Sequence, residues 1–124
     1  MLSEGFDRSR VTELRHVITS CARSAGLAGD RLGDFVVAVN ELLTNAVRHG
    51  GGLGHVALWV EDGAVVCEVT DSGGGIPPDL ATGARPAPDQ PGGWGLWLAG
   101  ELTDTIEITS GRDGTAVRVA TQTF

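Results

Sequence analysis

The spacing of apolar residues predicts two amphipathic helices in the first half of the chain. From about residue 8 to residue 25, apolar positions recur every three or four residues and stop at Gly26, as is typical of a helix end. A second segment runs from about residue 30 to residue 49 and is followed by three consecutive glycines. Its predicted core-facing stripe consists of Phe35, Val39, Leu42, Leu43 and Ala46.

The second half of the chain predicts four strands and one short helix. Asp62-Gly63 is a strong hairpin signal and joins the first two strands. Residues 95–102 predict the helix, and a turn at residues 111–114 joins the last two strands. Helices on one face of a mixed, mostly antiparallel sheet make a two-layer α/β sandwich. The predicted strands span residues 55–61, 64–71, 105–109 and 115–121.

Length and proline content indicate one domain with one long loop. The 124 residues are expected to form a single domain, 1–124, with room for one core. All five prolines lie within residues 73–93, so that segment is expected to be a loop. A loop of this length inside a compact domain is typically a binding loop or a cover over a site.

The net charge of the chain and its lack of lysine exclude some classes of function. A formal net charge of −7 argues against a nucleic-acid partner, because contacts with nucleic-acid phosphates need clustered Lys and Arg. Nucleotide binding stays open, since a bound divalent cation can neutralise phosphates locally. The sequence contains no lysine, and all nine basic residues are arginines. A P-loop NTPase is thereby excluded, because its phosphate-binding loop requires a lysine.

Cysteine usage and hydropathy favour a cytoplasmic protein. Cys21 and Cys67 are the only cysteines, and two buried, reduced thiols are favoured over a disulfide. Residues 1–20 lack the apolar core of a signal peptide. No apolar run approaches the roughly 20 residues needed to span a bilayer, so no membrane partner is expected.

The second predicted helix carries an acid, an amide and a cation opposite its apolar stripe. Glu41, Asn45 and Arg48 fall within roughly 60° of one another around the helix, and His49 lies slightly further round. Asn45 offers a hard oxygen ligand suited to Mg²⁺. Glu41 can order a water or accept a proton, and Arg48 can neutralise phosphate charge. His49 can close a nucleotide pocket or cap the helix end. Taken alone, this face is more typical of a solvated polar surface than of a binding site.

The first glycine-rich segment suits an adenine site. Asp71 ends a predicted strand, and its carboxylate can accept a hydrogen bond from the exocyclic amine of adenine. Guanine has a carbonyl at that position, so adenine is favoured. The glycines at residues 73–75 let the backbone approach a flat ring. The Thr115 hydroxyl can bond adenine or a water shared with Asp71. A plain turn is the alternative for either segment taken alone.

The second glycine-rich segment predicts a phosphate site. Gly93, Gly95 and Leu96 lie where the short helix is predicted to begin, and Trp94 stands between the two glycines. The first amides of a helix lack partners within it and bind anions, and glycines let a phosphate come close. A lone G-x-G motif is weak evidence, but its place between a proline-rich loop and an apolar helix strengthens the prediction.

In this order the motifs resemble those of the GHKL ATPase superfamily, whose fold is the Bergerat fold. Residues 41–49 resemble its N box, residues 71–75 its G1 box and residues 93–96 its G2 box. Gly114-Thr115 resembles its last motif. The resemblance covers about residues 8–122 and is strongest to the anti-sigma regulatory factors, the serine-protein kinase branch.

The resemblance implies a domain that binds ATP or ADP together with Mg²⁺. It implies Asn45 as the Mg²⁺ ligand, Glu41 as the catalytic base or water-orienting acid, and Asp71 as the partner of the adenine amine. Arg48 is the second candidate catalytic residue. The remaining predicted nucleotide contacts are His49, Gly73, Gly75, Ile76, Gly93, Gly95, Leu96 and Thr115.

The leading functional hypothesis is an ATP-dependent serine/threonine protein kinase. Its implied partners are an anti-anti-sigma factor, which it phosphorylates, and a sigma factor, which it sequesters; the resemblance also allows a homodimer. One alternative, motivated by Trp94 and the proline-rich loop, is a non-catalytic module that binds ATP while holding a partner. Another alternative is an ATPase domain that works with a separate sensor protein.

Overall fold

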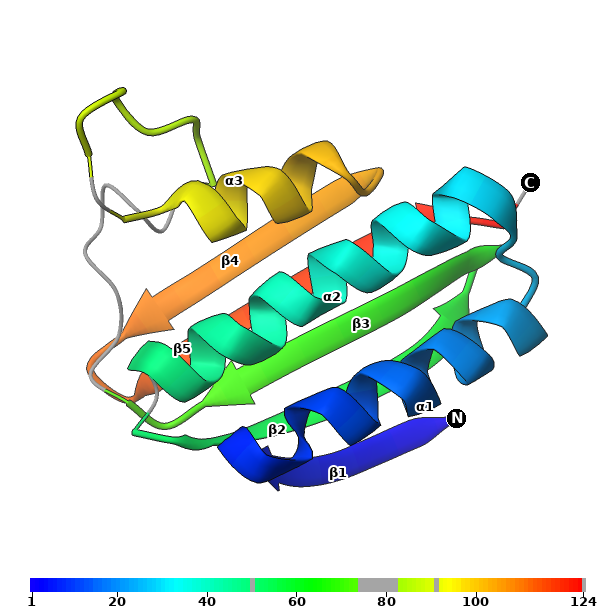
Figure 1. Ribbon diagram of the computed structural model, residues 1–124, viewed down its shortest axis with the longest axis horizontal. Coiled ribbons are helices and arrows are strands. Elements are labelled where there is room, and N and C mark those ends of the chain that lie inside the picture. The colour runs from blue at the N-terminus through cyan, green and yellow to red at the C-terminus, as the bar shows by residue number, and fades with distance from the viewer. Residues whose placement is uncertain (50, 74–82, 91, 124) are drawn as a thin grey trace.

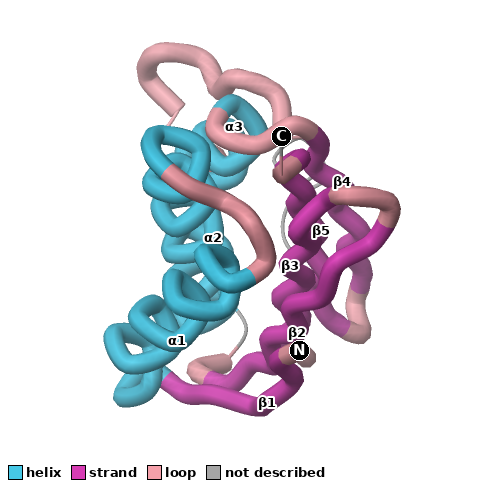
Figure 2. The backbone as a smooth tube through the Cα atoms, turned by 90° about the vertical axis from the view of Figure 1, so that its right-hand side faces the viewer, coloured by secondary structure: helices cyan, strands magenta, loops and turns pink. Residues whose placement is uncertain are grey.

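The computed structural model describes residues 1–49, 51–73, 83–90 and 92–123 and confirms the predicted two-layer α/β sandwich (Figure 1). In the described chain, five strands form one sheet in the order β1-β2-β3-β5-β4, and every neighbouring pair is antiparallel. The helices cover one face of this sheet (Figure 2). The elements are β1 (Leu2–Asp7), the 3₁₀ helix η1 (Arg8–Arg10), α1 (Val11–Ser24), α2 (Gly29–His49), β2 (Leu53–Glu61), β3 (Ala64–Asp71), α3 (Trp94–Glu101), β4 (Thr105–Gly111) and β5 (Gly114–Gln122).

The core lies between α2 and the central strands β3 and β5. All members of the predicted helix stripe are buried, so α2 packs on the sheet as its periodicity indicates. Alternate residues of each strand point to opposite faces, which places one apolar row of each strand under the helices. The strand residues of this layer are Val65, Cys67 and Val69 of β3 and Val117 and Val119 of β5. No helix in the described parts of the chain is long and apolar enough to cross a membrane.

The edge strand β1 is an element that the sequence pattern did not predict. Three of its six residues are exposed, so its apolar signal is weak. Its pairing with β2 is secured by Phe6, which is 5% exposed and lies directly against Gly54. A Cβ atom at Gly54 would lie 2.7 Å from Cζ of Phe6, so only glycine leaves room for this ring. The partner strand also explains why β2 begins at Leu53, opposite Asp7, and not at residue 55.

Both cysteines are free thiols, as predicted, but only one of them is buried. Cys67 has no exposed surface, and burial raises the pKa of its thiol to about 12. Its thiol therefore stays protonated at neutral pH and serves as an apolar core group. Cys21 lies on α1 and is only partly buried, which corrects the prediction that both thiols are buried.

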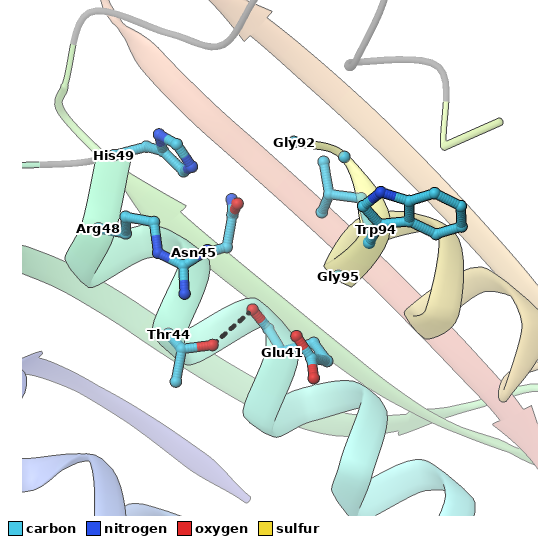
Figure 3. A pocket seen from close by; sticks show the side chains of 10 residues that line it. Glu41, Thr44, Asn45, Arg48, His49, Gly92, Trp94 and Gly95 are labelled. Atoms are coloured by element: carbon cyan, nitrogen blue, oxygen red, sulfur yellow. Dashed lines mark hydrogen bonds between the residues drawn. The ribbon is translucent and has the colours of Figure 1, made fainter. Parts of the chain in front are cut away.

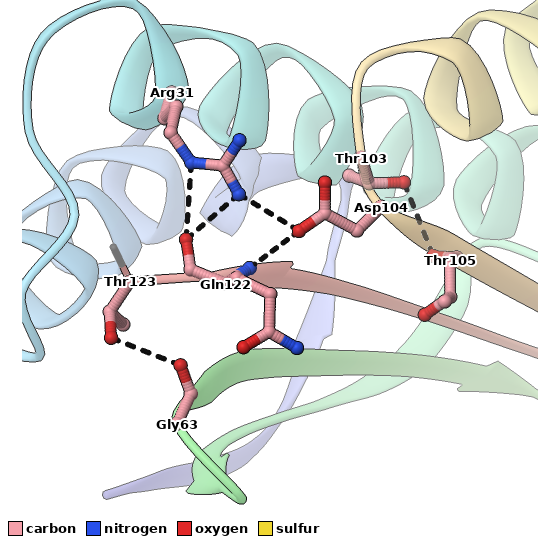
Figure 4. A network of polar contacts seen from close by, with 7 residues as sticks. All are labelled: Arg31, Gly63, Thr103, Asp104, Thr105, Gln122 and Thr123. Atoms are coloured by element: carbon pink, nitrogen blue, oxygen red, sulfur yellow. Dashed lines mark hydrogen bonds and ion pairs between the residues drawn. The ribbon is translucent and has the colours of Figure 1, made fainter.

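A polar network connects the start of α2 to the residue before β4 and to the last residue of β5 (Figure 4). Asp104 accepts a hydrogen bond from the backbone N–H of Gln122 at 2.7 Å and another from Nη2 of Arg31 at 2.8 Å. Arg31 also donates from Nε and Nη2 to the carbonyl of Gln122, at 3.1 and 2.9 Å. The Gln122 amide holds the pKa of Asp104 below its ordinary value of 3.8; desolvation opposes this, and the Arg31 side chain adds a smaller lowering effect.

We expect Asp104→Asn to lower the melting temperature by about 3–5 °C, because an exposed charge-assisted network is worth roughly 1 kcal/mol. The stabilisation from a carboxylate with a lowered pKa is complete above its ordinary value of 3.8 and is lost as the pH falls through the lowered pKa of the folded state. Thermal unfolding between pH 7 and pH 3 should therefore show a difference between wild type and variant that shrinks below about pH 4. Asp113→Asn, in the exposed β4–β5 turn, is the matched control. A constant difference across this range would contradict the assignment.

Candidate functional site

The described residues form a pocket between the C-terminal half of α2 and the N-terminus of α3 (Figure 3). Its volume is about 180 Å³. Seven of the predicted site residues line it: Glu41, Asn45, Arg48, His49, Gly93, Gly95 and Leu96. The lining is completed by Thr44, Gly92 and Trp94. Two motifs that are far apart in the sequence therefore meet in one cavity.

The helical period of α2 explains how its polar residues reach this pocket. Glu41 and Asn45 are one turn apart and partly buried, while Arg48 and His49 are exposed at the last turn. In Figure 3 the side chains of Asn45 and His49 point into the space between the ends of α2 and α3. Thr44 lines the same pocket, and sequence reasoning missed it. Its hydroxyl donates to the backbone carbonyl of Asn40 at 3.0 Å, so this polar group is satisfied within the helix.

Gly95 brings α3 into close contact with the acid of α2. A Cβ atom at Gly95 would lie 2.7 Å from Oε2 of Glu41, closer than any side chain could approach without displacing the carboxylate. The two helices pack together, with Leu96 and Ala99 of α3 buried. A residue with a Cβ at this position would push the carboxylate aside, whereas glycine lets the Glu41 carboxylate lie beside the first turn of α3.

The first turn of α3 presents free backbone amides to the pocket. Gly93 is the N-cap residue, and no side chain caps this end of the helix. The N–H of Trp97 bonds to the carbonyl of Gly93 at 3.1 Å and begins the ladder of hydrogen bonds. The amides before it have no partner within the helix and point out of its N-terminus, where the helix dipole also favours negative charge. This arrangement suits an anion such as a phosphate.

A second cluster of predicted residues lies where β3 and β5 pair. Asp71 and Thr115 are directly opposite each other, so their side chains share the face of the sheet that the helices cover. Asp71 accepts a hydrogen bond from the N–H of Gly73 at 3.0 Å, which closes the turn after β3. Gly75 and Ile76, which were also predicted here, lie outside the described residues.

Ser110 is part of this cluster and was missed by sequence reasoning. Its hydroxyl lies 2.8 Å from the hydroxyl of Thr115, its partner across the β4–β5 pair. Thr115 is only 4% exposed, so this hydrogen bond satisfies a buried polar group. The signal that could have found Ser110 is the strand register, which the sequence alone does not provide.

The pocket is smaller than a complete small-molecule site, and its lining has the chemistry that phosphate groups need. Its volume of about 180 Å³ is below the roughly 300–1,000 Å³ of complete small-molecule sites. Its lining combines an amide carbonyl, a carboxylate, a guanidinium and free N–H groups, which is a set for phosphates and a hard cation. Asp71 does not line it. The adenine contacts predicted at Asp71 and Thr115 therefore lie outside the lining of this pocket.

The comparisons with known proteins agree with this fold. A profile of the histidine kinase-like ATPase domain family matches residues 6–121. The structure of the RsbU and RsbW domains of Rv1364c from Mycobacterium tuberculosis is similar over 98% of the chain, with 22% identity and a TM-score of 0.66. The present chain spans 32% of the length of that chain. A search of curated protein sequences gave no significant match.

Two solved chains from histidine kinases are similar to this chain along nearly their whole length. The mycobacterial sensor histidine kinase MprB is 21% identical, with 98% of this chain and 97% of that chain covered and a TM-score of 0.60. The catalytic domain of histidine kinase ThkA is 16% identical, with 99% and 97% covered and a TM-score of 0.63. These likenesses concern the fold.

Together, the two-layer sandwich and the match to this family profile identify an ATPase domain of the GHKL class. The chain belongs to the histidine kinase-like ATPase domain family, and membership of this family implies that it binds ATP or ADP.

Proposed function

We propose that the protein is an ATP-dependent serine/threonine protein kinase of the anti-sigma type. It phosphorylates an anti-anti-sigma factor and sequesters a sigma factor. The observation that carries the proposal is the convergence of Glu41 and Asn45 with the free amides of α3 in one pocket. The likeness to a protein with an RsbW domain supports this branch of the family. The amino-acid pattern of residues 40–52, which resembles that of the anti-sigma regulatory factors, supports it as well.

At the phosphate end, residues of α3 would bind the phosphates and residues of α2 would bind the metal ion. The amides of α3 would bind phosphate oxygens, and the Asn45 carbonyl would hold Mg²⁺. When bound, Mg²⁺ neutralises the charge of the phosphates.

Glu41 would act as the general base. It would accept the proton of the acceptor hydroxyl as that oxygen bonds to the terminal phosphorus and the bond to ADP breaks. Arg48, exposed at the rim of the pocket, would stabilise the charge that develops on the transferred group. His49 would close the pocket beside it.

At the other end, Asp71 would accept a hydrogen bond from the adenine amine and so discriminate against guanine. Thr115 lies opposite Asp71, where its hydroxyl can share a water with the carboxylate. Gly73, Gly75 and Ile76 would lie against the base. We therefore expect the protein to bind ATP more tightly than GTP.

The first test is nucleotide binding by the purified protein. We expect Asn45→Ala to weaken ATP binding at least about tenfold in the presence of Mg²⁺, by loss of a metal ligand. In EDTA the two proteins should bind ATP alike. Asn40→Ala is the matched control, because Asn40 lies on α2 outside the pocket. Isothermal titration calorimetry would measure the ATP affinity of each protein with Mg²⁺ and with EDTA.

The second test uses radiolabelled ATP and candidate anti-anti-sigma proteins. Acid-stable label on a serine or threonine of the partner supports the kinase. Binding of ATP without transfer to any candidate favours the non-catalytic alternative. Absence of adenine-nucleotide binding in the presence of Mg²⁺ contradicts the proposed function altogether.

A further inference from the structure

Helix α3 is apolar on more than one side, and only one side packs on α2. Leu96 and Ala99 are buried, and α3 contacts α2 extensively. Trp94 and Trp97, three positions apart, lie on one side of the helix and are partly buried. A helix that is apolar all round needs cover beyond a single partner.

Residues 83–90, which we call the strap, provide that cover. Figure 1 shows this segment on the side of α3 away from α2. The guanidinium carbon of Arg85 lies 5.2 Å from the ring centre of Trp97, a cation–π contact. Pro86 is buried, and a Cβ at Gly83 would be 3.3 Å from Cδ1 of Ile108 in β4. The strap is therefore packed on both α3 and β4.

Trp94 joins the strap to the start of α3. Its indole N–H donates to the backbone carbonyl of Gln90 at 2.8 Å, and the N–H of Gln90 donates to the carbonyl of Ala87 at 2.9 Å. The indole also meets the ring of Trp97 edge to face, with centroids 5.9 Å apart. In Figure 3 this ring extends away from Asn45 and His49, so it leaves the space between the helices open.

These contacts restrain Trp94, which lies between Gly93 and Gly95 of the proposed phosphate site. Gly93 and Gly95 have no side chains to hold the loop in place, and no side chain caps α3. The backbone between them is restrained through the side chain of Trp94, at one end by Gln90 and at the other by Trp97. Amides that are already oriented bind an anion more tightly, because less conformational entropy is lost on binding.

We propose that Trp94 is a positioning residue for the phosphate end of the nucleotide site, through its indole N–H bond to the strap. The inference rests on the proposed placement of the phosphates at α3. The side chain of Trp94 does not touch the nucleotide in this role. It holds the first turn of α3 in the conformation that presents the amides and keeps Gly95 beside Glu41.

The test is Trp94→Phe, which keeps an aromatic ring and removes the N–H. We expect ATP and ADP to bind about fivefold more weakly, the value for loss of one net hydrogen bond, and adenosine to bind as in wild type. The ratio of ATP to adenosine affinity is measured within one protein by competition with a fluorescent ATP analogue. A variant that was simply less folded would lose both affinities equally. Gln90→Ala keeps the backbone carbonyl and should bind as wild type, as should Trp59→Phe on the far side of the sheet.

Amide hydrogen exchange without nucleotide gives a second, independent measurement. Trp94→Phe should speed exchange of the Trp97 amide, whose bond to Gly93 begins the helix. If wild type binds ATP but the ATP-to-adenosine ratio and the exchange rate are unchanged in Trp94→Phe, the inference is wrong and the proposed function stands. If wild type binds no adenine nucleotide, both are overturned.

Discussion

Glu41→Gln is expected to lower the rate of ATP turnover by about 10²–10⁴-fold, the usual contribution of a general base. The amide has the shape of the carboxylate but cannot accept the proton. The side chain should keep its place beside Gly95, where the two helices meet. ATP affinity should consequently change by less than about threefold, because the interaction is needed in the transition state and not for binding.

Turnover can be followed as ATP hydrolysis, so this experiment does not depend on finding the protein partner. Glu101→Gln, at the exposed far end of α3, is the matched control and should behave as wild type. A Glu41→Gln variant that hydrolyses ATP at the wild-type rate would show that Glu41 is not the base. If instead wild type and variant both bind ATP and neither turns it over, the non-catalytic alternative gains support.

Gly114→Ala is expected to destabilise the fold by roughly 3 kcal/mol and to lower the melting temperature by about 10 °C. A Cβ at this position would lie 2.0 Å from the backbone carbonyl oxygen of Asp71, and a backbone atom cannot rotate away as a side chain can. The φ angle of +131° adds strain for any residue with a Cβ. Relief requires β3 and β5 to separate where Asp71 meets Thr115, so adenine binding should weaken as well.

Gly111→Ala is the control within the same hairpin. Gly111 pairs with Gly114, yet a Cβ there would meet no atom within 4 Å. Its melting temperature should stay within about 2 °C of wild type, as for most exposed substitutions. Equal effects of the two substitutions would mean that general hairpin flexibility, and not the contact with Asp71, determines the stability here.

Local patterns in the sequence predicted the parts of the site that lie on single elements. The period of α2 placed Glu41 and Asn45 on one face and the core stripe on the other, and both placements agree with the structure. The same helical period predicted that Arg48 and His49 lie near Glu41 and Asn45, and all four residues line one pocket. The glycines before α3 indicated a helix start, which the structure has at Trp94. In each case the information lies within a few turns of chain, where backbone geometry fixes relative positions.

The elements that the sequence did not predict depend on contacts between distant residues. Strand β1 forms because Phe6 fits against Gly54, and Ser110 joins Thr115 only through the register of β4 and β5. Trp94 could be noted as unusual between two glycines, but its bond to Gln90 follows from the path of the strap. Such contacts are set by packing and register, which a residue's neighbours in the sequence do not encode.

The sequence by itself therefore determined the class of this protein, since the acid, the amide and the glycine turns are local patterns whose order along the chain resembles that of the GHKL superfamily. The tertiary structure decided how they work together. Packing of α3 against α2 brings Gly95 to Glu41, and pairing of β3 with β5 brings Asp71 to Thr115. The physical reason is that covalent geometry sets positions along one element, whereas positions between elements are set by the close packing of their side chains.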